Sequence, residues 1–158
     1  FPSLPLKIMF PHLHITIVDA LKKRINFLQH LVEELGLQNV NCVHGRAEDI
    51  GRDPEHRDQY DIVTARAVAR LPVLNEICLP FAKPGGLFAA MKGSDPEEEV
   101  AEAKKSLRLL SAALKEVHRF VLPGDEEAAR HIIVAEKLDH TPKPYPRKAG
   151  LPFKKPLK

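Results

Sequence analysis

The chain lacks the features that mark membrane and disulfide-rich secreted proteins. No apolar run approaches the roughly 18 uninterrupted residues that a bilayer-spanning helix needs, and no basic segment followed by an apolar one opens the chain. Only two cysteines are present, Cys42 and Cys78, and they lie far apart inside apolar runs, which argues against a disulfide framework. We therefore expect a cytoplasmic protein with no membrane partner.

Signs of metal chemistry and of repeats are missing as well. The eight histidines are scattered without the spacing typical of metal ligands, so we predict no metal site. No internal repeat or low-complexity segment occurs. With 158 residues, of which 44% are hydrophobic, the chain has enough apolar material for one ordinary domain with a core.

Positive charge is concentrated at the end of the chain. Residues 140–158 hold six of the 24 Lys and Arg residues and none of the 21 acids, so residues 1–139 form a mildly acidic body that carries a basic arm. Five prolines favour an extended course for this arm. A solvated tail is one interpretation. The alternative is RNA binding, because Tyr145 and Phe153 alternate with cations and can stack on bases, although they can also pack the arm onto the body. The cations that we expect to meet phosphates are Arg147, Lys148, Lys154 and Lys155.

Strand and helix signals alternate along the body. Short apolar, β-branched runs predict strands, and stripes of apolar residues spaced three or four apart predict helices. Strands are expected at 14–19, 39–44, 60–65, 87–92, 116–122 and 131–138, and helices at 20–35, 71–81 and from Pro96 to about Leu114. Strands separated by helices predict an α/β fold with a parallel sheet, here followed by an antiparallel strand pair at the end of the chain.

Ligands of such sheets bind beyond the carboxyl ends of the strands. The residues found there are Asp19, Ala20 and Leu21, then Ala47 and Glu48, then Arg66, and finally Lys92. An acid after the second strand of a nucleotide-binding unit commonly accepts the ribose hydroxyls. Asp19 fits that place, but it fits a helix N-cap equally well. Together Asp19 and Glu48 favour an adenosine moiety.

Two arginines follow the strand "YDIVTA". Arg is rarely buried without a partner, so Arg66 and Arg70 suggest an anion near the end of this strand. Arg66 is the candidate for a bound ligand. For Arg70 we favour pairing with an acid of the protein over contact with RNA phosphate.

The stretches "HGRAEDI", "YDIVTARAVARL", "ICLPFAKPGG" and "PYPRKAGLP" resemble those of the bacterial RsmG (also called GidB) family, the guanine-N7 methyltransferases of small-subunit ribosomal RNA. The resemblance covers essentially the whole chain. It implies a class I S-adenosylmethionine-dependent, Rossmann-like methyltransferase fold, and methyl transfer from S-adenosylmethionine to N7 of a guanine in 16S ribosomal RNA. It also implies that the partner is this RNA or the small ribosomal subunit, and we expect a monomer.

The same resemblance assigns the cofactor site. It implies that the residues bordering S-adenosylmethionine are Phe1, Asp19, Ala20, Leu21, Ala47, Glu48 and Arg66. No general base is assigned, because N7 of guanine carries a lone pair and needs no deprotonation. The family places a central strand and a glycine-rich turn immediately before Phe1, so we expect the strands ending at Asp19 and Ala65 to lack the neighbour that they share.

Other functions stay open from the sequence. A nicotinamide dehydrogenase would share the sheet and Asp19 but would need a glycine-rich loop that is not found in these residues. Another Rossmann-type S-adenosylmethionine-dependent RNA methyltransferase would use the same cofactor residues. A non-catalytic RNA-binding fragment would need only the basic arm.

Overall fold

The computed structural model describes residues 2–66, 69–93, 95–124 and 128–158. The chain divides into two compact units, residues 1–47 and 48–158, which we describe one at a time. Among the described residues, no helix is both long and apolar enough to cross a membrane.

The first unit is a small parallel βαβ arrangement preceded by a helix. It contains α1 (Ser3–Met9), β1 (Ile15–Asp19), α2 (Lys22–Glu34) and β2 (Val40–His44). β1 and β2 pair in parallel over their full length, so that their carboxyl ends, Asp19 and His44, lie opposite each other. Ile25 of α2 is 1% exposed. Gly36 follows α2 with a φ of 63°, a conformation that favours glycine, and ends the helix as expected.

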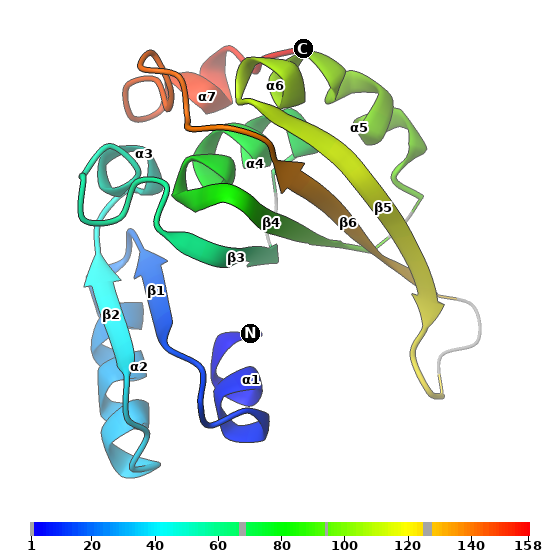
Figure 1. Cartoon of the computed structure of the whole chain (residues 1–158). Coiled ribbons are helices and arrows are strands. Elements are labelled where there is room, and N and C mark those ends of the chain that lie inside the picture. The colour runs from blue at the N-terminus through cyan, green and yellow to red at the C-terminus, as the bar shows by residue number, and fades with distance from the viewer. Residues whose placement is uncertain (1, 67–68, 94, 125–127) are drawn as a thin grey trace. The chain divides into compact units, whose positions relative to one another are not determined.

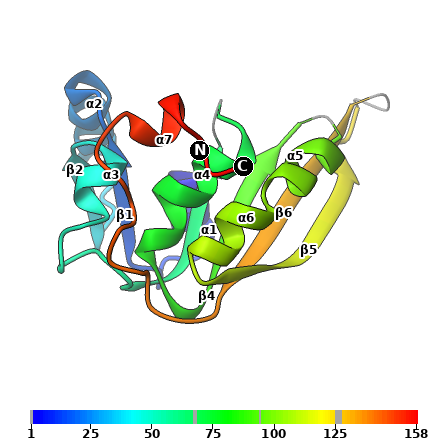
Figure 2. The same ribbon diagram turned by 90° about the horizontal axis from the view of Figure 1, so that it is seen from above.

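The second unit is a mixed sheet with helices on one face (Figures 1 and 2). Its strands are β3 (Tyr60–Arg66), β4 (Ala82–Lys92), β5 (Ala112–Val121) and β6 (Ala129–Lys137), in the order β3-β4-β6-β5. β3 and β4 are parallel, whereas β6 is antiparallel to both of its neighbours. The remaining elements are α3 (Ala47–Ile50), α4 (Leu71–Cys78), the 3-10 turn η1 (Leu79–Phe81), α5 (Glu97–Glu102), α6 (Lys104–Leu109) and α7 (Leu151–Lys154).

The core of this unit lies between the sheet and helices α4, α5 and α6. Phe88 and Ile133, on β4 and β6, are 1% and 2% exposed, and they pack with Leu74 of α4 and Leu110, both fully buried. Cys78 belongs to the same cluster, and burial raises the pKa of its thiol to about 12. Neither Cys78 nor Cys42 forms a disulfide.

Two glycines allow β4 to run close beside β3. Gly85 has a φ of 84°, and a Cβ atom at Gly86 would lie 2.9 Å from the carbonyl oxygen of Asp61. The turn "KPGG" therefore lies within a longer strand, and β4 begins at Ala82 rather than at residue 87 as predicted. Only residues without a side chain fit both requirements.

The other predicted strands are confirmed to within a few residues, but one predicted helix is wrong in its second half. In place of one helix from Pro96 to about Leu114, the chain forms α5 and α6 and then enters β5 at Ala112. Ser111 has a positive φ of 56° at this change of direction. Leu114, predicted on the buried helical stripe, lies on β5 and is 42% exposed.

β1 and β3 each have one strand neighbour in the described parts of the chain. β1 pairs with β2 and β3 with β4, in two separate sheets. The sequence led us to expect that these two strands would lack a shared neighbour. Ile62 of β3 is 63% exposed, although parallel strands are usually covered on both sides. An open, apolar strand edge favours pairing with other chains.

We therefore predict that these 158 residues, produced alone, self-associate through the edge of β3. Light scattering should show particles larger than a monomer at micromolar concentration. Replacing Ile62 with lysine places a charge on this edge and should shift the population toward monomer. The prediction fails if the unchanged chain stays monomeric.

Candidate functional site

The carboxylate of Asp19, at the end of β1, already has two partners within the protein. Asp19 Oδ1 accepts a hydrogen bond from the backbone N–H of Leu21 at 2.8 Å, and its Oδ2 lies 3.3 Å from Nη1 of Arg24. The loop is also tied to β2, because the His44 ring nitrogen Nε2 lies 3.0 Å from the Ala20 carbonyl oxygen. Asp19, Ala20 and Leu21 thus lie together in one turn before α2.

This geometry bears on the two interpretations of Asp19. The N-cap position of α2 is Leu21, which makes no side-chain cap hydrogen bond, so the capping interpretation of Asp19 is wrong; its contact with the Leu21 N–H closes a short turn ahead of the helix. A carboxylate offers about four lone-pair positions, and these two contacts occupy only two of them. Asp19 therefore retains acceptor capacity for hydroxyl groups, which suits a ribose.

Glu48 begins the second unit within α3. Its side chain is buried, with 2% exposure, which is unusual for a glutamate, whereas Ala47 before it is half-buried. A buried carboxylate is suited to hold a donor such as an exocyclic amine, and the adenine contact stays a prediction.

Arg66 is the last residue of β3, where its backbone lies beside Met91 of β4, and its side chain is exposed. It thus stands at the carboxyl end of the parallel pair β3 and β4. Glu48 and Arg66 belong to the second unit, whereas Asp19, Ala20, Leu21 and Ala47 belong to the first. Phe1, the remaining predicted cofactor residue, lies outside the described residues.

Arg70 pairs with acids of the protein, which confirms the preferred interpretation. Its Nε lies 3.1 Å from Glu102 Oε2, and its Nη2 lies 3.9 Å from Glu98 Oε1. The hydrogen bond to Glu102 and the nearby negative charges raise the pKa of Arg70 above its ordinary value. This cation helps to hold α5 beside the start of α4.

Lys92, at the end of β4, takes part in a second set of contacts that the sequence did not reveal. Its ammonium donates to the Ala69 carbonyl at 2.6 Å and to Glu99 Oε1 at 3.0 Å. The same Glu99 oxygen accepts from the Leu71 backbone N–H at 3.0 Å. Glu99 therefore joins the end of β4 to the start of α4. The run of three glutamates at 97–99 was the only sequence signal, and it indicated only a helix start.

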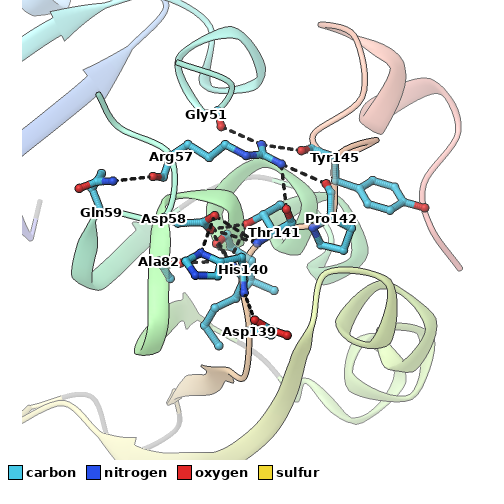
Figure 3. Close-up of polar contacts among 12 residues, drawn as sticks. Gly51, Arg57, Asp58, Gln59, Ala82, Asp139, His140, Thr141, Pro142 and Tyr145 are labelled. Atoms are coloured by element: carbon cyan, nitrogen blue, oxygen red, sulfur yellow. Dashed lines mark hydrogen bonds and ion pairs between the residues drawn. The ribbon is translucent and has the colours of Figure 1, made fainter. Parts of the chain in front are cut away.

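The first residues of the basic arm are hydrogen-bonded to the rest of the second unit. Figure 3 shows the guanidinium of Arg57 between Gly51 and the arm residues Pro142 and Tyr145. Arg57 donates to the carbonyl oxygens of Tyr145 at 2.7 Å and of Thr141 and Pro142 at 3.0 Å each. Three backbone carbonyls of the arm are thus bound to one side chain.

A buried ion pair of Lys137 with Asp58 secures the same segment, and Figure 3 labels Asp58 and Thr141 next to Arg57. Lys137 is fully buried, and its Nζ lies 2.9 Å from Asp58 Oδ1 and 2.6 Å from Thr141 Oγ1. Burial alone would raise the pKa of Asp58, but hydrogen bonds from Thr141 and Lys137 and the charge of Lys137 hold that pKa below its ordinary value. Burial lowers the pKa of Lys137, a change that Asp58 opposes.

Farther along the arm, Arg147 is bound to Glu76 of α4. Two nitrogens of its guanidinium, Nε and Nη2, lie 2.8 and 2.7 Å from the two carboxylate oxygens, and its backbone N–H donates to Oε1 at 2.9 Å. Glu76 is fully buried. The arm is mostly irregular, as expected, but it includes the one-turn helix α7, which its prolines led us not to expect.

The four cations predicted to bind RNA therefore differ in their surroundings. Lys148, Lys154 and Lys155 are exposed, and within the described residues no ion pair involves them. The side chain of Arg147 is only 21% exposed and is engaged by Glu76. The RNA contact of all four stays a prediction, and for Arg147 the geometry favours a structural role.

The family model described as GidB, rRNA small subunit methyltransferase G, matches residues 1–133. A ribosomal RNA small subunit methyltransferase G from Brevibacillus brevis is 57% identical over 157 residues, which are 99% of this chain and 66% of that protein. The protein of the same description from Bacillus subtilis is 54% identical, with 99% of this chain and 65% of that one covered. The chain thus spans just under two thirds of the length of these curated relatives.

Solved structures resemble the fold at much lower identity. TYW2 from M. jannaschii, in complex with AdoMet, has a TM-score of 0.61 at 17% identity, covering 87% of this chain and 63% of that one. A methyltransferase from Pyrococcus furiosus has a TM-score of 0.63 at 17% identity, covering 87% and 68%. At these identities the likeness concerns the fold, which is the class I methyltransferase α/β fold with antiparallel terminal strands.

Proposed function

Since the chain belongs to the GidB family, rRNA small subunit methyltransferase G, we propose that it transfers a methyl group from S-adenosylmethionine to N7 of a guanine in 16S ribosomal RNA. The observation that carries this proposal is the family match over residues 1–133. The class I methyltransferase fold supports it, as do Asp19 at the end of β1 in the first unit and Arg66 at the end of β3 in the second, each considered within its own unit. The 16S RNA, free or in the small ribosomal subunit, is the proposed partner of a monomeric protein.

The described strand ends suit the proposed cofactor. Asp19 has acceptor capacity left for ribose hydroxyls, with Ala20 and Leu21 bordering the same turn. Glu48 offers a buried carboxylate and Ala47 a small neighbour for an adenine ring. Arg66 supplies a cation at the end of β3 for a carboxylate group. Phe1, through the family resemblance, is assigned to the same site.

When bound, S-adenosylmethionine supplies an electrophilic sulfonium methyl group. The lone pair of guanine N7 can attack such a carbon without losing a proton first, so the residues of this chain need only bind and align the two reactants. We assign no general base.

The proposal is tested in cells. Ribosomal RNA from a strain lacking the full-length gene should have lost one guanine methyl group, found by mass mapping, and the intact gene should restore it. An unchanged methylation pattern would overturn the proposal. A non-catalytic RNA-binding protein, the alternative kept from the sequence, predicts RNA binding by the purified protein together with that unchanged pattern.

Arg66 provides a second test, on the cofactor alone. We predict that Arg66→Ala in the full-length protein weakens S-adenosylmethionine binding by about 1 kcal/mol or more, as expected for the loss of a charge-assisted contact. Isothermal titration calorimetry measures this change. Arg70→Ala is the matched control, because Arg70 is engaged by Glu102 and should leave the affinity unchanged. Equal affinities of Arg66→Ala and the unmodified protein would contradict the assignment.

A further inference from the structure

We propose that α7 and the residue preceding its turn, Lys148, form a preformed site for unpaired RNA, in which a base stacks on the ring of Phe153 while phosphates meet Lys148, Lys154 and Lys155. The inference rests on the proposed function, since it assumes an RNA substrate, and it deepens it by naming the part of the RNA and the side chains that bind it. Arg147 serves in this site as a positioning residue.

The first observation is the exposure of Phe153. Its side chain is 49% exposed, whereas two apolar residues near it in the arm are buried: Leu157 is 8% exposed and Pro152 is fully buried. The arm is thus attached by other residues, and its largest apolar ring faces the solvent. A single exposed apolar residue is common, so this observation alone does not indicate a ligand.

The second observation is the charge around the ring. The arm contains no acid, and Lys148, Lys154 and Lys155 are all exposed. Lys154 and Lys155 directly follow Phe153 in the same short segment. An exposed aromatic ring among unopposed cations is the combination by which proteins bind single-stranded nucleic acids, with bases stacked on the ring and cations along the backbone.

The third observation is that the segment is held in place. Arg147, bound to the buried Glu76, also donates from Nη2 to the Lys155 carbonyl oxygen at 2.6 Å. One guanidinium therefore connects α4 to the far end of α7. Gly150, with a φ of 85°, makes the turn into α7, and the backbone N–H of Lys155 donates to the Leu151 carbonyl at 2.8 Å. A site ordered before binding loses less conformational entropy when it binds.

These observations favour unpaired RNA over the other candidates. A duplex hides its base faces, so it would contact the lysines but could not stack a base on Phe153. An acidic protein surface would also be attracted to the lysines, but it offers no base to stack on the ring. Stacking on Phe153 is therefore the feature that separates single strands from both.

The test compares Phe153 variants of the full-length protein. The probe is a fluorescein-labelled single-stranded RNA of mixed sequence, used alone and annealed to its complement, with affinity measured by anisotropy. Phe153→Ala should weaken single-strand binding at least about fivefold, the effect of losing one stacked base. Phe153→Tyr should retain the affinity within about twofold, since its ring also stacks. Duplex binding should change less than about twofold in either variant.

Phe10→Ala is the matched control, because Phe10 has nearly the same exposure, 47%, and lies outside the arm. It should leave both RNA affinities unchanged. Melting curves for each variant check that the fold is kept. The proposal is overturned if Phe153→Ala binds the single strand as well as the unmodified protein, or loses single-strand and duplex binding equally.

The lysines are tested through salt dependence. Replacing Lys148, Lys154 and Lys155 together with alanine should reduce the log-log salt slope of single-strand binding by about 2, or roughly 0.7 for each lost phosphate contact. The control is the alanine triple variant of Lys104, Lys105 and Lys115, which are exposed but lie outside the arm. An equal reduction in the control would overturn the site, because the effect would then reflect net charge.

Failure of the site and failure of the proposed function have different outcomes. S-adenosylmethionine affinity, measured by calorimetry in every variant, should stay unchanged because none of the substituted residues is assigned to the cofactor. If Phe153→Ala loses RNA but the unmodified protein transfers no methyl group, the site stands and the methyltransferase proposal fails. If methyl transfer occurs and Phe153→Ala binds RNA normally, the site alone is wrong.

Discussion

Arg147→Ala in the full-length protein should lower the free energy of unfolding by about 3–5 kcal/mol. The reason is Glu76, which is fully buried and whose two carboxylate oxygens are both held by the Arg147 guanidinium. Without Arg147 that carboxylate stays in the interior with its charge uncompensated. Urea unfolding followed by circular dichroism measures the change.

Two further variants separate the buried charge from the loss of side-chain contacts. The double variant Glu76→Gln, Arg147→Met contains no uncompensated charge and should recover most of the lost stability. Arg70→Ala removes an arginine from an exposed ion pair and should cost less than about 1 kcal/mol. If Arg147→Ala costs no more than Arg70→Ala, Glu76 is not held as the structure indicates.

Lys137→Met should be comparably destabilising, by about 3–5 kcal/mol, because it leaves Asp58 without its buried partner. The ammonium of Lys137 also lies 3.0 Å from each of the carbonyl oxygens of Leu79 and Ala82. Methionine has a similar length but no donor, so four oxygen acceptors lose a hydrogen-bond partner. Asp58→Asn combined with Lys137→Met removes the unpaired charge and should restore part of the loss.

The same variant should change the response to acid. In the unmodified protein the pKa of Asp58 lies below its ordinary value of 3.8. The unfolded chain therefore binds this proton more tightly, so the stability from Asp58 is present above the ordinary pKa and is lost as the pH falls through the folded value. Lys137→Met removes two causes of that lowering, so the loss should begin at a higher pH. Urea unfolding midpoints measured across the acid pH range test this. If the midpoint of the variant falls over the same pH range as that of the unmodified protein, the prediction is contradicted.

The sequence predicted well the features that depend on neighbouring residues. Gly36 ends α2 because its backbone needs a positive φ, and the alternation of apolar runs placed β1, β2, β3 and β6 within a few residues. The strand-end residues Asp19 and Arg66 followed from those boundaries. The helix after Pro96 was predicted too long because Leu110 and Leu114 fit a helical stripe, whereas the chain turns at Ser111.

Contacts between distant residues could not be predicted in this way. Arg147 and Glu76 are 71 positions apart, and Lys137 and Asp58 are 79 apart, so no local pattern connects them. Arg147 looked like an ordinary solvated or RNA-binding residue in the sequence, and nothing in the sequence drew attention to Lys137. In the structure these pairs are set by burial, because Glu76 of α4 and Lys137 of β6 are both fully enclosed. The sequence therefore predicted only an extended basic arm and left open whether it is solvated, binds RNA or packs on the body, whereas in the structure much of it is fastened to the second unit.

That fastening has a consequence for the lifetime of the protein in a cell. A proline-rich basic tail without secondary structure would be an easy target for proteases, which bind their substrates as free, extended backbone. Here Arg57 occupies the carbonyl oxygens of Thr141, Pro142 and Tyr145, and Arg147 occupies that of Lys155. Cleavage within the arm requires these contacts to open first. Two arginines thereby shield a segment whose composition alone would mark it for degradation.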